Sequence, residues 1–264
     1  MRVRPKTRAL TRRGGLAGLV AIAALLVSVT PASAAPGDAS AFGAKLNLSL
    51  LGSQAVSAGS FAEANANGPI TNTFTGVNLP NVLKTGVLNA SAERNDKTGG
   101  VFSRASTADV KLDLLKVVTG GISATVIEAE CEATQKGLSG KSKLVGVNLG
   151  KLGVVNSDPA PNTKIDVNLV GVDIAEIIFN EQLKNADGGL TVNAVHVKLL
   201  GGVLGSVGTG DLVLSSATCG PAGLPIPMAS GAGLWIGLGL LAAAALPVAF
   251  VAIRRYRALA PVTA

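Results

Sequence analysis

Hydrophobic and polar residues alternate along several separate stretches of this chain, and this pattern limits the possible folds more than any other feature. Apolar side chains occupy every second position over 42–50, 108–114 and 190–194, and 207–219 also reads as a strand. Neighbouring side chains of a strand point to opposite faces, so this spacing predicts half-buried strands. Glycine, asparagine, aspartate and proline separate them. The sequence therefore predicts a mainly β fold with a single sandwich-like extracellular domain.

Two stretches have patterns that differ from this alternation. Leu79, Val82, Leu83 and Val87 are spaced as in a short helix, although Gly86 interrupts it. Residues 172–183 have the sequence VDIAEIIFNEQL, which fits a helix or a buried strand equally well, because periodicity alone does not separate the two.

The first 34 residues have the layout of a secretory signal peptide. Arginine and lysine dominate residues 2–13, an apolar segment covers 16–29, and Ala32-Ser33-Ala34 provides an A-x-A cleavage site. The apolar segment is shorter than the roughly 20 residues that a spanning helix needs. We therefore expect export of residues 35 onward.

A second uncharged segment lies near the C-terminus, at 229–253, and Arg254, Arg255 and Arg257 follow it. Its length and basic flank predict one C-terminal transmembrane helix with the lipid bilayer as its partner. The protein would be single-pass in the cell membrane, with the N-terminal domain extracellular and the C-terminus cytoplasmic. Leu224-Pro225-Ile226 resembles the start of a sortase motif, but Pro227 follows and the required threonine is absent.

These boundaries divide the chain into five parts. We expect a signal peptide at 1–34, a β-rich extracellular domain at 35–220, a Pro/Gly linker at 221–228, the transmembrane helix at 229–253 and a basic cytoplasmic tail at 254–264.

The distribution of charge and of aromatic residues disfavours nucleic acid as a partner. The formal net charge is +7, but the two terminal segments contribute nine basic residues and none of the 16 acidic ones. The section between them is therefore slightly acidic. It also lacks tryptophan and tyrosine, since Trp235 and Tyr256 lie near the C-terminus. Stacking on exposed nucleobases or sugars usually needs such rings.

The chain has two cysteines, Cys131 and Cys219. An even number of cysteines in an exported protein favours a disulfide over two buried thiols.

Residues that could carry chemistry are few. His196 is the only histidine, and it lies among apolar neighbours in VNAVHVKLL, which favours a structural role over an extracellular hydrolase site. One histidine and a cysteine pair do not make a usual zinc site. Glu128, Glu130 and Glu132 share one face of a predicted strand, which leaves a calcium-dependent binding module as another alternative. We predict no enzymatic activity, catalytic residue, cofactor or bound metal.

The exported section resembles the choice-of-anchor P family of exported actinobacterial surface proteins. The residues that carry the resemblance are Ser40-Ala41-Phe42-Gly43, Asn180-Glu181-Gln182, the run 189–197 and the cysteine pair. The family has no established activity. The resemblance implies surface location and a family signature of Asn180, Glu181, Gln182, Asn193 and His196. We therefore expect an exported, membrane-anchored cell-envelope protein with a structural or interaction role and an envelope protein or cell-wall component as partner.

Overall fold

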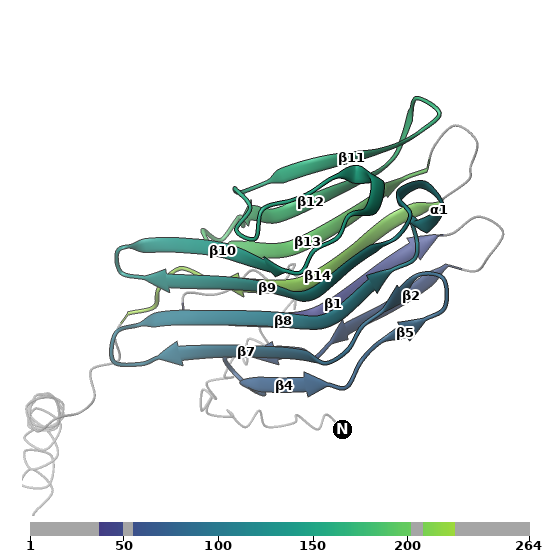
Figure 1. Cartoon of the computed structure of the whole chain (residues 1–264). Coiled ribbons are helices and arrows are strands. Elements are labelled where there is room, and N and C mark those ends of the chain that lie inside the picture. The colour runs from purple at the N-terminus through teal and green to yellow at the C-terminus, as the bar shows by residue number, and fades with distance from the viewer. Residues whose placement is uncertain (1–36, 50–54, 202–207, 225–264) are drawn as a thin grey trace, which may run out of the picture. The chain divides into compact units, whose positions relative to one another are not determined.

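The described residues of the computed structural model, 37–49, 55–201 and 208–224, form two antiparallel seven-stranded sheets that lie face to face (Figure 1). All of them belong to the unit of residues 33–264. The first sheet has the order β11-β12-β13-β14-β1-β2, and β3 also pairs with β1. The second sheet has the order β10-β9-β8-β6-β5, with β7 pairing with both β8 and β4.

The strands of the first sheet have these bounds: β1 Ala39–Ser49, β2 Val56–Phe61, β3 Ala64–Asn65, β11 Thr163–Leu169, β12 Val172–Lys184, β13 Leu190–Leu200 and β14 Thr209–Cys219. The second sheet contains β4 Thr71–Phe74, β5 Asn78–Leu79, β6 Leu83–Lys84, β7 Leu88–Asn95, β8 Gly100–Leu112, β9 Ile122–Thr134 and β10 Gly137–Val145. Two short helical turns, α1 Lys116–Thr119 and η1 Gly150–Leu152, lie in the connections.

The alternating stretches form strands as predicted, in β1, β8, β13 and β14. The ambiguous segment 172–183 belongs to strand β12. The short helix suggested for 79–87 is wrong. This segment contains the short strands β5 and β6, and β6 pairs with the end of β8. Pairing with β8 therefore overrides the weak helical spacing.

The predicted fold class is wrong in its membrane helix. In the part of the chain that the structure describes, no helix is long and apolar enough to cross a membrane. The segment 229–253 lies outside the described residues, as do the predicted signal peptide and cytoplasmic tail. The described part of the chain is therefore mainly β and forms two sheets.

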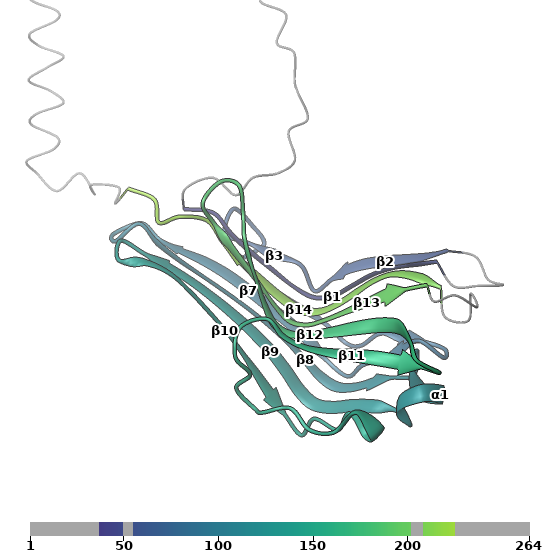
Figure 2. The same cartoon turned by 90° about the horizontal axis from the view of Figure 1, so that it is seen from above.

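The long strands of both sheets bend midway, and the first sheet lies on the concave side of the bend (Figure 2). At the bend, the alternation of side chains shifts by one residue. In β13, Leu190, Val192 and Ala194 are buried before it, and Val195 and Val197 line the apolar space between the sheets after it. Two successive residues, Ala194 and Val195, thus belong to the buried core.

Strands β1, β12 and β14 make the same one-residue shift opposite this point of β13. The pairing register is therefore the same on both sides of the bend. In β14, Leu214 lines the space between the sheets, yet the next residue, Ser215, also reaches the second sheet, where its hydroxyl donates to the carbonyl of Ile127 at 2.9 Å. The backbone φ of Ser215 is 53°, and that of Asn180 in β12 is 50°. Such left-handed residues locally reverse which face a side chain takes.

Small and apolar residues fill the space between the two sheets. The largest buried side chains include Phe179, Leu46, Leu88 and Leu144. Gly43 lies at the bend in β1, where a Cβ atom would come within 2.6 Å of the Cβ of Leu88. The closeness of β1 and β7 at this point requires glycine. The apolar cavity that remains deeper in the core is about 20 Å³, close to the volume that holds a single water molecule.

Candidate functional site

A cluster of polar side chains lies on the outer face of the first sheet, on its concave side at the bend. Glu181 comes from β12, Asn193, His196 and Lys198 from β13, and Asp211 from β14. Residues three apart in a regular strand point to opposite faces. The shift at Ala194 and Val195 places Asn193 and His196 on the same face, where both contact Glu181.

Glu181 is the centre of this cluster. Its Oε2 accepts a hydrogen bond from Nδ2 of Asn193 at 2.8 Å and lies 2.7 Å from Nδ1 of His196. Its Oε1 lies 3.4 Å from Nζ of Lys198. The side chain of Glu181 is only 5% exposed. A buried carboxylate of this kind is stable only because donors surround it.

His196 lies between two carboxylates. Its Nε2 is 2.9 Å from Oδ1 of Asp211, and its Nδ1 faces Glu181. Carboxylates accept hydrogen bonds, so both ring nitrogens must donate, and the ring must carry a proton on each. The arrangement therefore favours the imidazolium form and links β12, β13 and β14 through charge-assisted bonds.

The pKa values of both partners reflect competing effects. Burial on its own lowers the pKa of His196, but the hydrogen bonds and charges of Glu181, with a hydrogen bond to Asp211, raise it above its ordinary value. Burial on its own raises the pKa of Glu181. Hydrogen bonds from His196 and Asn193, with the positive charges of His196 and Lys198, outweigh burial and lower that pKa to about 2. Glu181 is therefore ionised and His196 protonated at mildly acidic pH.

The five signature residues divide between the two faces of the first sheet. Glu181, Asn193 and His196 meet on the outer face. Asn180 donates to the carbonyl of Pro159, and Gln182 crosses to the second sheet, where its Nε2 donates to the carbonyl of Gly140 at 2.8 Å. Glu181 and Gln182 are successive residues of β12 and therefore point to opposite faces of the sheet.

The acidic face of β9 is neutralised by basic neighbours. Arg104 of β8 pairs with both Glu128 and Glu130, and Lys141 of β10 lies 2.7 Å from Glu130. Within the described ranges, no group of three or more acidic, histidine or cysteine side chains is arranged to hold a metal ion. Glu128, Glu130 and Glu132 thus share a strand face as predicted, while two of them are occupied by cationic side chains.

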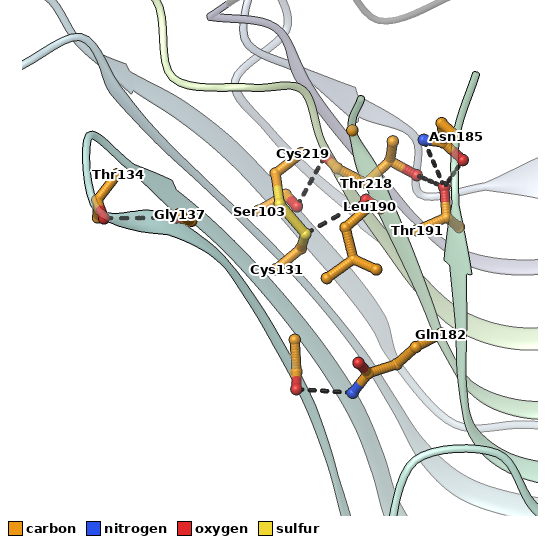
Figure 3. The surroundings of a disulfide bond; sticks show 12 residues. Ser103, Cys131, Thr134, Gly137, Gln182, Asn185, Leu190, Thr191, Thr218 and Cys219 are labelled. Carbon is orange, nitrogen blue, oxygen red and sulfur yellow. Dashed lines mark hydrogen bonds between the residues drawn. A yellow bond between two sulfur atoms is a disulfide. The ribbon is translucent and has the colours of Figure 1, made fainter. Parts of the chain in front are cut away.

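The predicted disulfide is present. Cys131 of β9 and Cys219 of β14 are bonded, with their Cα atoms 5.6 Å apart, and the bridge joins the two sheets (Figure 3). Both residues are fully buried. The hydroxyl of Ser103 donates to the carbonyl of Thr218 beside the bridge, which adds a hydrogen bond between the sheets at this point. The carbonyl oxygen of Leu190 lies 3.3 Å from Sγ of Cys131 as a contact, because a disulfide sulfur has no hydrogen to donate.

Sequence reasoning did not identify Asp211 and Lys198 as members of the cluster. They are directly paired across β13 and β14. That pairing depends on the register of two strands, which neither local sequence reveals. The only signal in the sequence that pointed to Asp211 and Lys198 was that each is a charged residue on a predicted strand.

Comparison with protein-family models, with curated proteins and with solved structures finds no match. The resemblance to the choice-of-anchor P family therefore stays a prediction.

Proposed function

We propose that this protein is exported and works in the cell envelope as a non-catalytic β-sheet module with a structural or interaction role. The observation that carries the proposal is the way His196 is held. Each of its ring nitrogens faces a carboxylate oxygen, of Glu181 or of Asp211. A general base needs a ring nitrogen that can reach the substrate or a nucleophile. A histidine bound on both sides is better suited to cross-linking strands.

Export is supported by the disulfide together with the N-terminal sequence. Disulfides persist in oxidising compartments and are rare in the reducing cytosol. The Cys131–Cys219 bridge fits the first of these settings, as does the signal-peptide pattern at 1–34. The resemblance to exported surface proteins leads to the same location.

The two alternative functions have weaker support. An extracellular hydrolase would use His196 as its base, but the hydrogen bonds of this ring within the described residues go to carboxylates and to no hydroxyl or thiol. A calcium-dependent module would use Glu128 and Glu130, which already pair with Arg104 and Lys141. Calcium would have to displace both cations.

The catalytic alternative is tested with the full-length chain and its His196→Gln variant. Both are assayed against panels of ester, peptide and glycoside substrates, with circular dichroism to verify that the variant is folded. We expect both proteins to give only background turnover. Hydrolysis by the wild type that disappears in the folded variant would show that the protein is a hydrolase.

Location is tested separately on intact cells. A membrane-impermeant biotin reagent should label lysines of the full-length chain, and alkylation without reduction should leave Cys131 and Cys219 unmodified. A chain recovered unlabelled in the cytosol, with both cysteines alkylated, would contradict export.

A further inference from the structure

Strand β4 forms an open edge of the second sheet, where it pairs with β7 on one side and with no described strand on the other (Figure 1). All of residues 71–74 are exposed. The carbonyl of Ile70 accepts a hydrogen bond from the N–H of Ala92, which fixes the alternation of the antiparallel ladder. The N–H and C=O groups of Thr71 and Thr73 therefore point away from β7. In the described part of the chain, no other backbone group bonds to them. Such groups are ready to pair with another strand.

The other edge strands of the described residues carry features that oppose pairing with another chain. Strand β10 contains Lys141 and Lys143, and β11 contains Lys164 and Asp166. The pairing of β2 with β1 shifts register, and β3 and β5 are only two residues long. Charges, irregularities and short length are common means of protecting an edge. Strand β4 has no register shift, and residues 64–83 around it contain no charge. The edge at β4 therefore lacks the protection that the others have.

The sequence of this edge is complementary to itself. Thr71, Thr73 and Thr75 occupy alternate positions, and all three are exposed. If a second copy of the chain lies antiparallel with the two Thr73 residues opposite each other, Thr71 of each copy faces Thr75 of the other. Threonine pairs across strands are favourable. With the same backbone alternation continued to Thr75, the three facing pairs would form about six hydrogen bonds, two at each pair. A twofold axis at Thr73 therefore pairs the open backbone groups and places threonine opposite threonine throughout.

Phe74 gives the same register an apolar contact on the other face of the sheet. Its ring lies 5.1 Å from that of Phe61 in β2, measured between centroids, yet the residue is still 40% exposed. With Thr73 on the twofold axis, Phe74 lies opposite Asn72 of the second copy. The two Phe74 residues are then diagonal neighbours, a spacing that aromatic side chains can reach across. Pairing would thus cover aromatic surface that a single copy leaves in water.

We propose that two copies of this chain associate by antiparallel pairing of their β4 strands about Thr73, which joins the two second sheets into one continuous sheet. A twofold axis sets the same surface of both copies against itself, so the edge must be complementary to itself, as this one is. The strand is short and the interface small, so association should depend on protein concentration. This inference goes beyond the proposed function and does not depend on export.

Cysteine cross-linking of the full-length chain tests the register. Facing residues in a hydrogen-bonded pair have Cα atoms about 5.5 Å apart, which suits a disulfide. Under mild oxidation, Thr73→Cys chains should form a linked dimer several-fold faster than Ser139→Cys chains, the matched control at an exposed position of edge strand β10. Thr71→Cys and Thr75→Cys chains should each link poorly alone, because identical positions are then four residues out of register, about 14 Å apart. Mixed together, they should link efficiently.

Sedimentation equilibrium of the full-length chain in density-matched detergent measures the association without a cross-link. The mass of the wild type should rise with concentration towards twice that of one chain. Thr73→Lys places a charge on the open edge and should hold the mass at that of one chain, whereas Ser139→Lys should behave as the wild type. Circular dichroism verifies that both variants are folded. Cross-linking of Thr73→Cys no faster than the control, or a dimer that persists in Thr73→Lys, would overturn the proposal. Neither result bears on export or hydrolysis, which have their own tests.

Discussion

His196 and Glu181 depend on each other for their charge. Glu181 is buried, and its negative charge is offset by His196, by Lys198 and by the amide of Asn193. On the other side of the ring, Asp211 is 59% exposed and contributes a weaker, solvent-screened attraction. The two negative charges of Glu181 and Asp211 balance the two positive charges of His196 and Lys198. Removing one member therefore leaves an uncompensated charge at a site with little access to water.

This balance predicts that stability depends on pH from both sides. The pKa of His196 is raised above 6.5, so its stabilising contribution is complete below about pH 6.5 and is lost as pH rises through its folded-state pKa. The pKa of Glu181 is lowered from 4.5 to about 2, so its contribution is complete above 4.5 and is lost as pH falls towards 2. We expect the free energy of unfolding to be greatest between these limits. It should fall on the alkaline side as His196 loses its proton, and by about 3 kcal/mol on the acidic side as Glu181 is protonated.

Urea denaturation of the disulfide-bonded protein over a pH series measures this dependence. The His196→Gln variant is the control, because glutamine retains hydrogen bonding without titrating. It should be less stable than the wild type at mildly acidic pH and should lose much of the decline on the alkaline side. If the free energies of unfolding of the two proteins change in parallel with pH above about pH 6, titration of His196 does not cause the decline on the alkaline side.

At the scale of strands, the bend is what assembles the cluster. The sequence predicts strands well, because alternation is a local property of 42–50, 108–114 and 190–194. It also contains a sign of the bend, since Ala194 and Val195 are successive apolar residues in β13. The shift in facing depends on left-handed residues in neighbouring strands, such as Asn180 and Ser215. No local pattern predicts that they align across the sheet.

The candidate site was predictable only in part, for the same reason. Glu181, Asn193 and His196 were singled out by a resemblance, and their mutual contacts follow from the bend. Asp211 and Lys198 were missed, because their place in the cluster depends on cross-strand register. The facing of the β9 glutamates was predictable, whereas their pairing with Arg104 was not.

The close approach of β1 and β7 at the bend gives a second prediction. A Cβ at Gly43 would lie 2.6 Å from Cβ and 2.7 Å from Cδ2 of Leu88, a fully buried side chain. Gly43→Ala should therefore destabilise the protein by about 1–3 kcal/mol through overpacking. Leu88→Ala alone should cost about 2–5 kcal/mol through a cavity.

The double variant makes this prediction specific. Leu88→Ala removes Cγ and Cδ2, which a methyl group at position 43 would approach within 3.1 Å and 2.7 Å, while the Cβ–Cβ contact remains. The two costs should therefore sum to more than the double variant shows, because part of the overpacking is relieved. Denaturant titration of the four proteins gives the coupling free energy. Strictly additive costs would mean that the atoms of Leu88 beyond Cβ do not limit the packing at the bend.

For the whole molecule, the main covalent constraint is the bridge between the two sheets. Cys131 and Cys219 are separated by 88 positions in sequence. A cross-link over a loop of this length restricts the unfolded chain strongly, and the chain-entropy relation gives about 4–5 kcal/mol. The buried core between the sheets also contains many leucine, isoleucine and valine side chains besides the two cysteines. We therefore expect the chain without it to fold, but with a much smaller margin of stability.

Cys131→Ala with Cys219→Ala tests this expectation. Alanine is preferable to serine because both positions are fully buried, and a buried hydroxyl without a partner would add its own cost. The variant should keep the β-sheet circular dichroism spectrum and unfold with a free energy lower by about 3–4 kcal/mol, since native contacts offset part of the entropic effect. Reduced wild-type protein should match it. If the oxidised and reduced wild type unfold at the same denaturant concentration, the bridge does not stabilise the fold and must be retained for another reason.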